Sequence, residues 1–233
     1  MSSDFLGLCG VTLKDTFQFE TVVAHGGFGI VYRGRHLSLG KPVAIKVFSR
    51  PPGSEFESEA IELFFQESRI LATLEHPAIV RPYDCGTMTI EGHGELPWIA
   101  LEWIDGCTLG ELLRQHPGVR WSPSVVLDIL RPVMEALAEA HTNGIAHRDV
   151  APNNIMVCET SRGRRVRLID FGIARIRPHY DQASARIGEQ TSSGFIAHSP
   201  RYPAPEQMLG EHTGTWTDVH AIGLIAFHLL TGQ

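Results

Sequence analysis

A glycine-rich turn near the N-terminus has the composition of a phosphate-binding loop. The stretch from Ala24 to Val31 reads Ala-His-Gly-Gly-Phe-Gly-Ile-Val and lies between two segments with strand-like alternation. Because the turn carries little side-chain bulk, its backbone N–H groups could approach phosphate oxygens. A dinucleotide-binding loop would instead join a strand to a helix. On this stretch alone, a plain tight turn is as good an interpretation as a nucleotide loop.

A lysine on the following strand could bring a cation to the same phosphates. In Val43–Lys46, alternation places Ala44 and Lys46 on one face, a small side chain beside an ammonium group. An adenine ring could lie over the alanine while the lysine reaches the phosphates. Strand lysines usually face solvent, but Glu67 on the next predicted helix could pair with this one and orient it.

Clusters of polar residues in the C-terminal half complete an ordered series of motifs. The series runs through the glycine loop, Val43–Lys46, Glu67, His147–Asn154, Asp170–Gly172, Ala204–Glu206 and Asp218. Each motif alone could arise by chance, whereas the whole series in this order is not expected to. The series resembles that of Ser/Thr protein kinases, bacterial ones above all, from about Phe17 to Gln233.

The resemblance implies transfer of the γ-phosphoryl group of ATP to a Ser or Thr hydroxyl of a protein. Asp149 would orient the attacking hydroxyl or accept its proton. Asn154 and Asp170 would offer oxygen ligands to Mg²⁺, which neutralises charge on the phosphates. Lys46, held by Glu67, would add a positive charge beside the phosphates.

The resemblance also implies a nucleotide site, with Leu101 as gatekeeper and backbone groups of Glu102 and Ile104 facing adenine. The implied ATP-binding positions are Ala24, Gly26, Gly29, Val31, Ala44, Lys46, Leu101, Glu102, Ile104 and Met156. An internal spine linking two lobes is expected from Leu71, His147, Phe171 and Asp218.

The stretch Asp170–Glu206 resembles an activation segment, and Arg148 beside Asp149 suggests control by a phosphate bound there. The candidate autophosphorylation sites are Thr191, Ser192 and Ser193. Three solvated loop hydroxyls are an equally good interpretation of this run.

Three positions depart from the family pattern. Ala24 replaces the first glycine of the loop, and His198-Ser199-Pro200 replaces Gly-Thr-Pro. Ala151 stands where Ser/Thr kinases usually carry a lysine, and Asn153 does not supply the arginine that compensates in tyrosine kinases. Losing a transition-state cation lowers rates on the order of 10²-fold or more. A nucleotide-binding pseudokinase or scaffold is therefore an alternative. A small-molecule kinase is a third reading, opposed by the long activation segment.

Strand patterns predominate before residue 103, and helix patterns predominate after it. The predicted strands are Thr16–Val23, Ile30–Arg35, Pro42–Phe48, Ile79–Cys85, Pro97–Trp103, Ile155–Cys158 and Val166–Ile169, and the stretch between Cys85 and Pro97 reads as an exposed loop. The predicted helices are Glu57–Leu74, Leu109–Arg114, Pro123–Thr142 and Asp218–Thr231. We expect an α+β, two-lobed kinase-like fold. It has an antiparallel five-stranded sheet with one helix, then a mainly helical lobe lacking its last helices.

The expected divisions are an N-terminal extension at residues 1–16, an N-lobe at 17–102 and an incomplete C-lobe at 103–233. Kinase domains normally continue through helices that cover the Asp218 helix, so we expect its apolar residues to lose part of their cover. Those residues are Ile222, Leu224, Ile225, Phe227 and Leu229. Glu206 should lack its counter-charge, and self-association and low stability are expected.

The chain has 233 residues, 43% of them hydrophobic, and a formal net charge of -6. This acidic balance gives no reason to expect nucleic acid or an anionic membrane as partner. The cysteines at 9, 85, 107 and 158 lack metal-site spacing and read as free thiols. No apolar run reaches the roughly 18–20 residues of a membrane span, and the N-terminus does not read as a signal peptide. We expect a cytoplasmic protein that acts with ATP and Mg²⁺ on protein substrates.

Overall fold

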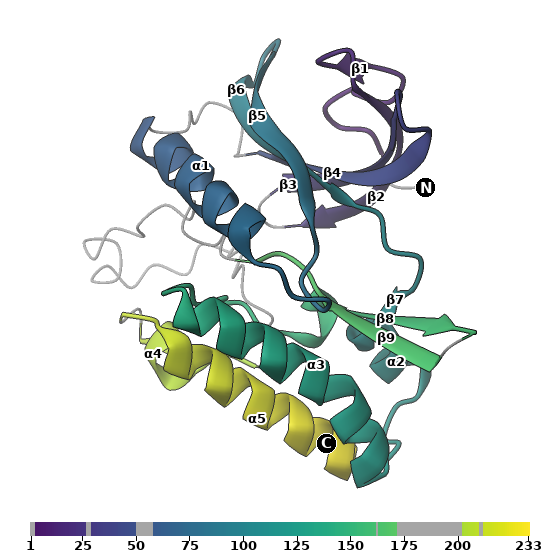
Figure 1. The fold of residues 1–233 in the computed structure, drawn as a ribbon, viewed down its shortest axis with the longest axis vertical. Helices are drawn as coiled ribbons and strands as arrows, with labels where there is room; N and C mark the ends of the chain where they lie inside the picture. The colour runs from purple at the N-terminus through teal and green to yellow at the C-terminus, as the bar shows by residue number, and fades with distance from the viewer. Residues whose placement is uncertain (1–2, 27–28, 50–57, 162, 172–201, 210–211) are drawn as a thin grey trace, which may run out of the picture. The chain divides into compact units, whose positions relative to one another are not determined.

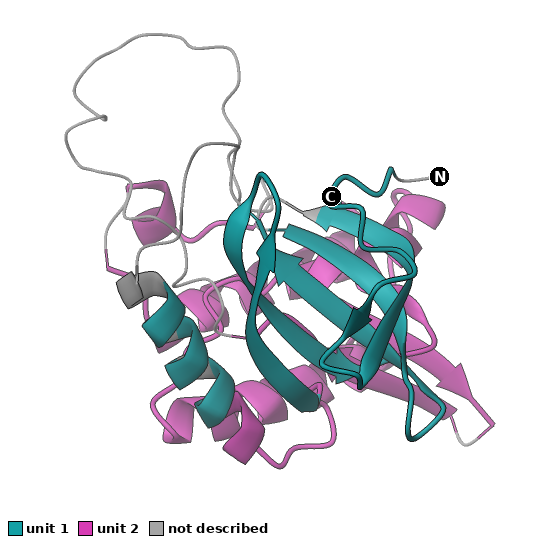
Figure 2. Cartoon of the chain, turned by 90° about the horizontal axis from the view of Figure 1, so that it is seen from above, with its two compact units in different colours: residues 1–70, 81–103, 175–197 teal, residues 71–80, 104–174, 198–233 magenta. Residues whose placement is uncertain are grey.

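The computed structural model describes residues 3–26, 29–49, 58–161, 163–171, 202–209 and 212–233. The described chain forms two compact units, shown in different colours in Figure 2. Unit 1 contains the residues up to Ile70 together with Arg81–Trp103, and unit 2 contains Leu71–Val80 and the described residues from Ile104 onward.

Unit 1 is built on a six-stranded sheet with the order β1-β2-β3-β4-β6-β5, in which every neighbouring pair is antiparallel. Its strands are β1 (Thr12–Leu13), β2 (Phe17–Gly26), β3 (Gly29–His36), β4 (Lys41–Phe48), β5 (Pro82–Ile90) and β6 (Gly94–Glu102). Helix α1 (Ser58–Thr73) lies beside this sheet (Figure 1), where Phe64 packs against Phe48 with ring centroids 5.3 Å apart.

Alternation along β4 separates the two faces of this sheet. Val43, Ile45 and Val47 are buried in one core, which β6 completes with Trp98. The N-terminal segment covers this face, because its three buried leucines belong to the same core; these are Leu6, Leu8 and Leu13. The opposite face of β4 carries Ala44 and Lys46, as the alternation predicts.

Unit 2 contains a three-stranded sheet and most of the helices. Its elements are β7 (Cys107–Thr108), α2 (Leu109–Gln115), α3 (Pro123–Thr142), the 3-10 turn η1 (Pro152–Asn154), β8 (Ile155–Thr160), β9 (Gly163–Leu168), α4 (Pro205–Met208) and α5 (Thr215–Thr231). Helix α3 starts with Ser122 as N-cap and proline in the first turn, and Thr108 with Glu111 forms a capping box on α2.

Helices α3 and α5 run antiparallel and side by side in unit 2 (Figure 1). At one end the Trp121 N–H donates to Leu229 O at 2.9 Å, and at the other end His141 contacts Asp218. The core between these helices and the small sheet includes fully buried Ile129, Val133 and Ile225. This packing places the last turn of α3 beside the first turn of α5, where the polar site lies.

Two sequence expectations are corrected by the structure. The stretch between Cys85 and Pro97 is not a loop, because β5 and β6 continue as a hairpin up to the Ile90–Gly94 pair. Cross-strand partners such as Met88 and Leu96, the latter buried, stabilise this extension. The sheet also has a sixth strand, β1, which pairs with β2 and anchors the N-terminal segment.

The apolar side of α5 is less exposed than expected. Ile222, Ile225 and Leu229 are buried and Leu224 is half-buried, whereas Phe227 is 54% exposed. The buried residues recur at helical spacing and face α3, which supplies the cover that the sequence could not show. No helix in the described part of the chain has the length and apolar character needed to cross a membrane. The four cysteines are free thiols.

Candidate active site

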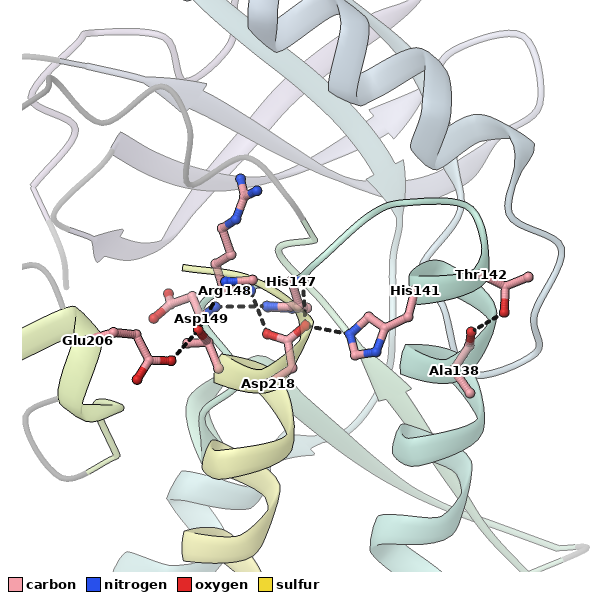
Figure 3. Close-up of polar contacts among 10 residues, drawn as sticks. Ala138, His141, Thr142, His147, Arg148, Asp149, Glu206 and Asp218 are labelled. Carbon is pink, nitrogen blue, oxygen red and sulfur yellow. Dashed lines mark hydrogen bonds and ion pairs between the residues drawn. The ribbon is translucent and has the colours of Figure 1, made fainter. Parts of the chain in front are cut away.

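The carboxylate of Asp218, at the start of α5, holds the loop that contains Asp149. Asp218 is fully buried, and its oxygens accept the His147 N–H at 2.8 Å and the Arg148 N–H at 2.6 Å. The Nε2 atom of His141, in the last turn of α3, lies 2.8 Å from the same carboxylate (Figure 3). A buried carboxylate is stable only when such donors replace water. Two helices and one loop therefore meet at a single side chain.

The Asp149 carboxylate is oriented by the amide of Asn154. Asn154 Nδ2 donates to Asp149 O at 2.7 Å and to its Oδ2 at 3.2 Å. With the nitrogen used in this way, the amide oxygen of Asn154 is the atom available to a cation. The short η1 turn creates the approach, since Asn154 N–H donates to Ala151 O at 2.8 Å.

The backbone is strained at two positions of this site. Arg148 has φ 64° and Asp170 has φ 61°, both in the left-handed region that non-glycine residues rarely adopt. Such conformations persist where the surrounding contacts determine them, and they concentrate at functional sites. At Arg148, the bond from its N–H to Asp218 and the bond from Gln207 Nε2 to its carbonyl, 2.9 Å, supply those contacts.

The loop before Asp149 and the segment before Asp170 are joined through His147. The His147 ring lies with Nε2 2.9 Å from Ile169 O, and its centroid is 4.8 Å from that of Phe171. Ile169 N–H in turn donates to Asn154 O at 2.9 Å. The four residues of the expected spine are all buried in unit 2; these are Leu71, His147, Phe171 and Asp218.

Strand register gathers five of the predicted nucleotide-binding residues of unit 1 on one sheet face. Lys46 lies opposite Val31, and Ala44 lies opposite Leu101. Directly opposed residues project to the same side of a sheet, so these side chains share a face. Ala24, opposite Val31, belongs to it as well. Lys46 is 9% exposed, and its Nζ lies 5.3 Å from the centroid of the Phe48 ring.

The glycine loop closes at a position that only glycine can occupy. Gly29 pairs with Gly26 and has φ 149°, and a Cβ atom there would meet the Val47 carbonyl oxygen at 2.1 Å. Three further predicted nucleotide-binding residues are Glu102, Ile104 and Met156. The Glu102 N–H donates to Arg81 O at 2.9 Å, and Ile104 and Met156 are both half-buried.

Several predicted positions lie outside the described residues. These are the side chain of Glu67, and with it the Lys46–Glu67 pair, the candidate phosphorylation sites Thr191, Ser192 and Ser193, and His198-Ser199-Pro200. The backbone of Glu67 lies in α1.

Three residues that the sequence reading missed support the site. His141 and Gln207 bind Asp218 and Arg148, as described above. The Thr217 hydroxyl donates to Glu206 Oε1 at 2.6 Å and holds the pKa of Glu206 below its usual value. Among the described residues, the Thr217 hydroxyl is thus a hydrogen-bond partner of Glu206. The sequence shows that His141 lies in α3 and Thr217 in α5, but it does not show their partners. His141 contacts a residue 77 positions away, and Thr217 contacts one 11 positions away.

The two residues predicted to bind Mg²⁺, Asn154 and Asp170, carry oxygen donors. No group of three or more metal-binding side chains occurs among the described residues. Mg²⁺ typically takes one or two protein oxygens and completes its shell with water and phosphate. The amide oxygen of Asn154 and the carboxylate of Asp170 match that requirement.

Comparison with known proteins gives a single family. The family model described as "Protein kinase domain" matches residues 17–233. The serine/threonine-protein kinase pkn2 of Myxococcus xanthus is 33% identical over 224 residues, which cover 96% of this chain and 25% of the relative. PknA of Mycobacterium tuberculosis is 34% identical over 226 residues, 96% of this chain and 48% of the relative. The chain thus spans a quarter to a half of the length of these relatives.

Solved structures give the same fold. The PknI kinase domain of Mycobacterium tuberculosis superposes with a TM-score of 0.70 and 30% sequence identity, covering 96% of this chain and 77% of the other. The antiparallel sheet of unit 1 and the mainly helical unit 2 are therefore the two parts of a protein-kinase fold, as the sequence predicted.

Proposed function

Because the chain belongs to the protein kinase domain family, we propose that it transfers the γ-phosphoryl group of ATP to Ser or Thr hydroxyls of proteins. The family in general uses ATP and Mg²⁺. The curated relatives named above are bacterial Ser/Thr protein kinases, and this supports a similar enzyme here.

The observation that carries the proposal is the position of Asp149. Its loop is held by the buried Asp218, and its carboxylate is oriented by Asn154. In the proposed reaction Asp149 accepts a hydrogen bond from the substrate hydroxyl and turns it toward the phosphorus atom. Phosphoryl transfer depends mainly on such positioning and on charge neutralisation.

We assign the remaining roles as follows. Asn154 and Asp170 would hold Mg²⁺, which when bound would supply positive charge to the phosphates of ATP. Lys46, oriented by Glu67, binds the phosphates. The adenine and ribose-phosphate contacts come from the sheet-face residues, the glycine loop and the stretch after β6; the assigned set is Ala24, Gly26, Gly29, Val31, Ala44, Leu101, Glu102, Ile104 and Met156.

The proposal includes the domain division and the setting of the protein. Residues 1–16 form an extension, 17–102 an N-lobe and 103–233 a C-lobe. A cytoplasmic location follows from the demand for ATP, and Arg148 is assigned to bind a phosphate on Thr191, Ser192 or Ser193. Mass spectrometry after incubation with ATP and Mg²⁺ should find that phosphate, and an unmodified segment in an active enzyme would contradict the regulatory role.

The function is tested by transfer of labelled γ-phosphate from ATP and Mg²⁺ to the chain itself and to a basic protein mixture. We expect incorporation that disappears in Asp149→Asn and in Lys46→Met. Equal incorporation in the wild type and Asp149→Asn would show that the signal comes from a contaminant and would contradict the proposal.

A second candidate, a nucleotide-binding pseudokinase, is favoured by one observation. Ala151 is 1% exposed and follows Asp149 closely, so a methyl group occupies the position at which the family pattern has a cation. ATP binding measured by calorimetry without any phosphoryl transfer would establish this alternative.

A further inference from the structure

The chain leaves the sheet of unit 1 at Trp103, between two residues that are proposed to contact adenine. Trp103 directly follows Glu102 and directly precedes Ile104. The ladder between β4 and β6 ends at the pair of Val43 and Glu102, and residues 103–106 belong to no strand. Contacts other than the hydrogen bonds of the sheet therefore hold this stretch in place.

A cation–π contact ties the Trp103 side chain to the sheet. The Cζ atom of Arg33, on β3, lies 5.2 Å from the centroid of the Trp103 ring, within the roughly 6 Å over which such a pair attracts. Arg33 lies opposite Ala44, and Ala44 lies opposite Leu101, so Arg33 projects from the face of the sheet that carries the predicted nucleotide-binding residues. The half-buried ring of Trp103 is thus held on this face by a residue without a predicted role.

A carboxylate on β2 restrains the Arg33 guanidinium. Glu20 Oε2 lies 3.8 Å from Arg33 Nε, and Glu20 Oε1 lies 2.9 Å from Arg35 Nε. The register between β2 and β3 shifts between Phe19 and Thr21, so Glu20 is the extra residue of a bulge, and bulges re-aim side chains. A single surface ion pair contributes little, but here two arginines share one carboxylate, and such a network restricts its members more.

On its other side, the stretch is bound to the residue that precedes β5. The Glu102 N–H donates to Arg81 O at 2.9 Å, and Glu102 Oε1 accepts the Arg81 N–H at 3.1 Å. Because the N–H of Glu102 is used in this way, its carbonyl is the backbone group through which it would contact adenine. Glu102 is thus held by two hydrogen bonds, and the next residue, Trp103, is held by its ring.

We propose that Arg33 is a positioning residue for the nucleotide, and that its contact with Trp103 orders the adenine-binding backbone of residues 102–104. This inference rests on the proposed kinase function and adds to it a residue that determines affinity for adenine. When the ring is held on the sheet, this backbone is ordered before the nucleotide arrives, so less conformational entropy is lost on binding. The contact acts on the adenine end of ATP and not on its phosphates.

The first test compares the binding of adenosine and ATP by calorimetry. Arg33→Gln should weaken both by the same factor, roughly 2- to 5-fold, which is what an exposed cation–π contact supplies. Lys46→Met should weaken the binding of ATP alone, because adenosine carries no phosphate. Arg33→Lys, which keeps a cation, should recover part of the loss. Unchanged or tighter adenosine binding in Arg33→Gln would overturn the inference.

A double-mutant cycle shows whether the two side chains act through their mutual contact. Trp103→Leu should weaken adenosine binding, and in that background Arg33→Gln should have no further effect, because its partner is already removed. Losses that multiply in the double variant would overturn the inference. In steady-state kinetics, Arg33→Gln should raise KM for ATP and leave kcat unchanged, since contacts to adenine are the same in the ground and transition states.

Arg35→Gln is the matched control. It removes the same charge beside the same Glu20 carboxylate and leaves the contact between Arg33 and Trp103 in place. Its affinity for adenosine should equal that of the wild type. A loss as large as that of Arg33→Gln would mean that overall charge, and not the contact with Trp103, determines the affinity, and would overturn the assignment.

Adenosine binding requires no phosphoryl transfer, which separates this inference from the proposed function. A protein that transfers phosphate and binds adenosine equally well with and without Arg33 keeps the function and overturns the inference. A protein that transfers no phosphate but binds adenosine through Arg33 contradicts the kinase proposal and supports the inference. The NMR signal of the Trp103 indole N–H, identified by its absence in Trp103→Leu, should shift in Arg33→Gln without nucleotide, and an unshifted signal would contradict the contact.

Discussion

Lys46 in unit 1 and Asp149 in unit 2 reach their positions by different physical routes. Lys46 belongs to a strand whose alternation and register with β3 and β6 determine the face on which its side chain lies. Asp149 lies in an irregular loop, and its placement depends on Asp218, whose carboxylate binds the Arg148 N–H across 70 positions of the chain. The sheet would keep its register with another residue at position 46, whereas the loop needs the Asp218 carboxylate in addition to its own hydrogen bonds between Asn154 and Asp149.

The proposed site residues of the two units therefore differ in how much they contribute to the stability of the fold. In unit 1, the core lies on the sheet face opposite Lys46, and the residue that is proposed to bind phosphate contributes little to it. In unit 2, Asp218 and His147, which hold the loop of Asp149, are fully buried, and Asn154 is half-buried. Changes at the site of unit 2 should therefore affect stability and activity together, and changes at Lys46 should affect ligand binding alone.

The largest effect is expected for Asp218→Ala. Removal of the carboxylate leaves two backbone N–H groups and the His141 ring without their acceptor, which should lower the free energy of unfolding by at least about 3 kcal/mol. The loosened loop should lower kcat about 10²-fold or more. Urea denaturation measures the first quantity, steady-state kinetics measures kcat, and hydrogen exchange at the His147 and Arg148 amides reports the loosening of the loop. Asp128→Asn, an exposed acid on α3, is the control. Wild-type exchange at those two amides in the variant would contradict the anchoring role.

The next effect concerns Lys46→Met. We expect ATP to bind roughly 10- to 100-fold more weakly, since a hydrogen bond to a charged group contributes about 1.5–3 kcal/mol. The free energy of unfolding should change by less than about 1 kcal/mol, because the register of β4 does not depend on this side chain. Calorimetry and urea denaturation give the two values. Lys41→Met, an exposed lysine on the same strand, should change neither. A loss of stability as large as that of Asp218→Ala would remove the contrast between the units.

A smaller effect is expected for Tyr32→Phe on the covered face of the same sheet. The buried Tyr32 hydroxyl donates to Asp4 Oδ1 at 2.9 Å, and burial with this contact raises its pKa. Losing the bond should lower the free energy of unfolding by about 1 kcal/mol and leave kcat unchanged. Tyr83→Phe, at a 46% exposed tyrosine, should change neither quantity. A lower kcat would show that the N-terminal segment influences the opposite face.

The smallest effect is a pH dependence at Glu206. Since its pKa is lowered in the folded protein, mainly by the Thr217 hydroxyl, Glu206 contributes stability above its ordinary pKa of 4.5. That contribution is lost as the pH falls through the lowered value. Thr217→Val should lose less stability than the wild type between about pH 6 and about pH 3. Thr217→Ser, which keeps the hydroxyl, should follow the wild type, and identical pH profiles in all three proteins would exclude the contact.

Patterns in the sequence predicted much of the secondary structure and the fold of this protein. Alternation in Val43–Lys46 correctly assigned the two faces of β4, and helical patterns located α2 and α3 to within one residue at each end. The order of the motifs predicted the kinase fold and the family. Strand faces and helix positions depend on residues a few positions apart, and the motif series is an order along the chain, so the sequence alone shows all of them. The roles of the individual site residues stay predictions.

Tertiary structure decided what depends on distant partners. The hairpin of β5 and β6 exists because Leu96 is buried opposite Met88, and Ile225 and Leu229 are covered because α3 packs on α5. The contacts of Asp218 with His141 and Arg148 come from the same packing. A residue's type shows which contacts it can make, but only the fold brings the partner within reach, because hydrogen bonds and burial act over a few ångströms and not along the sequence.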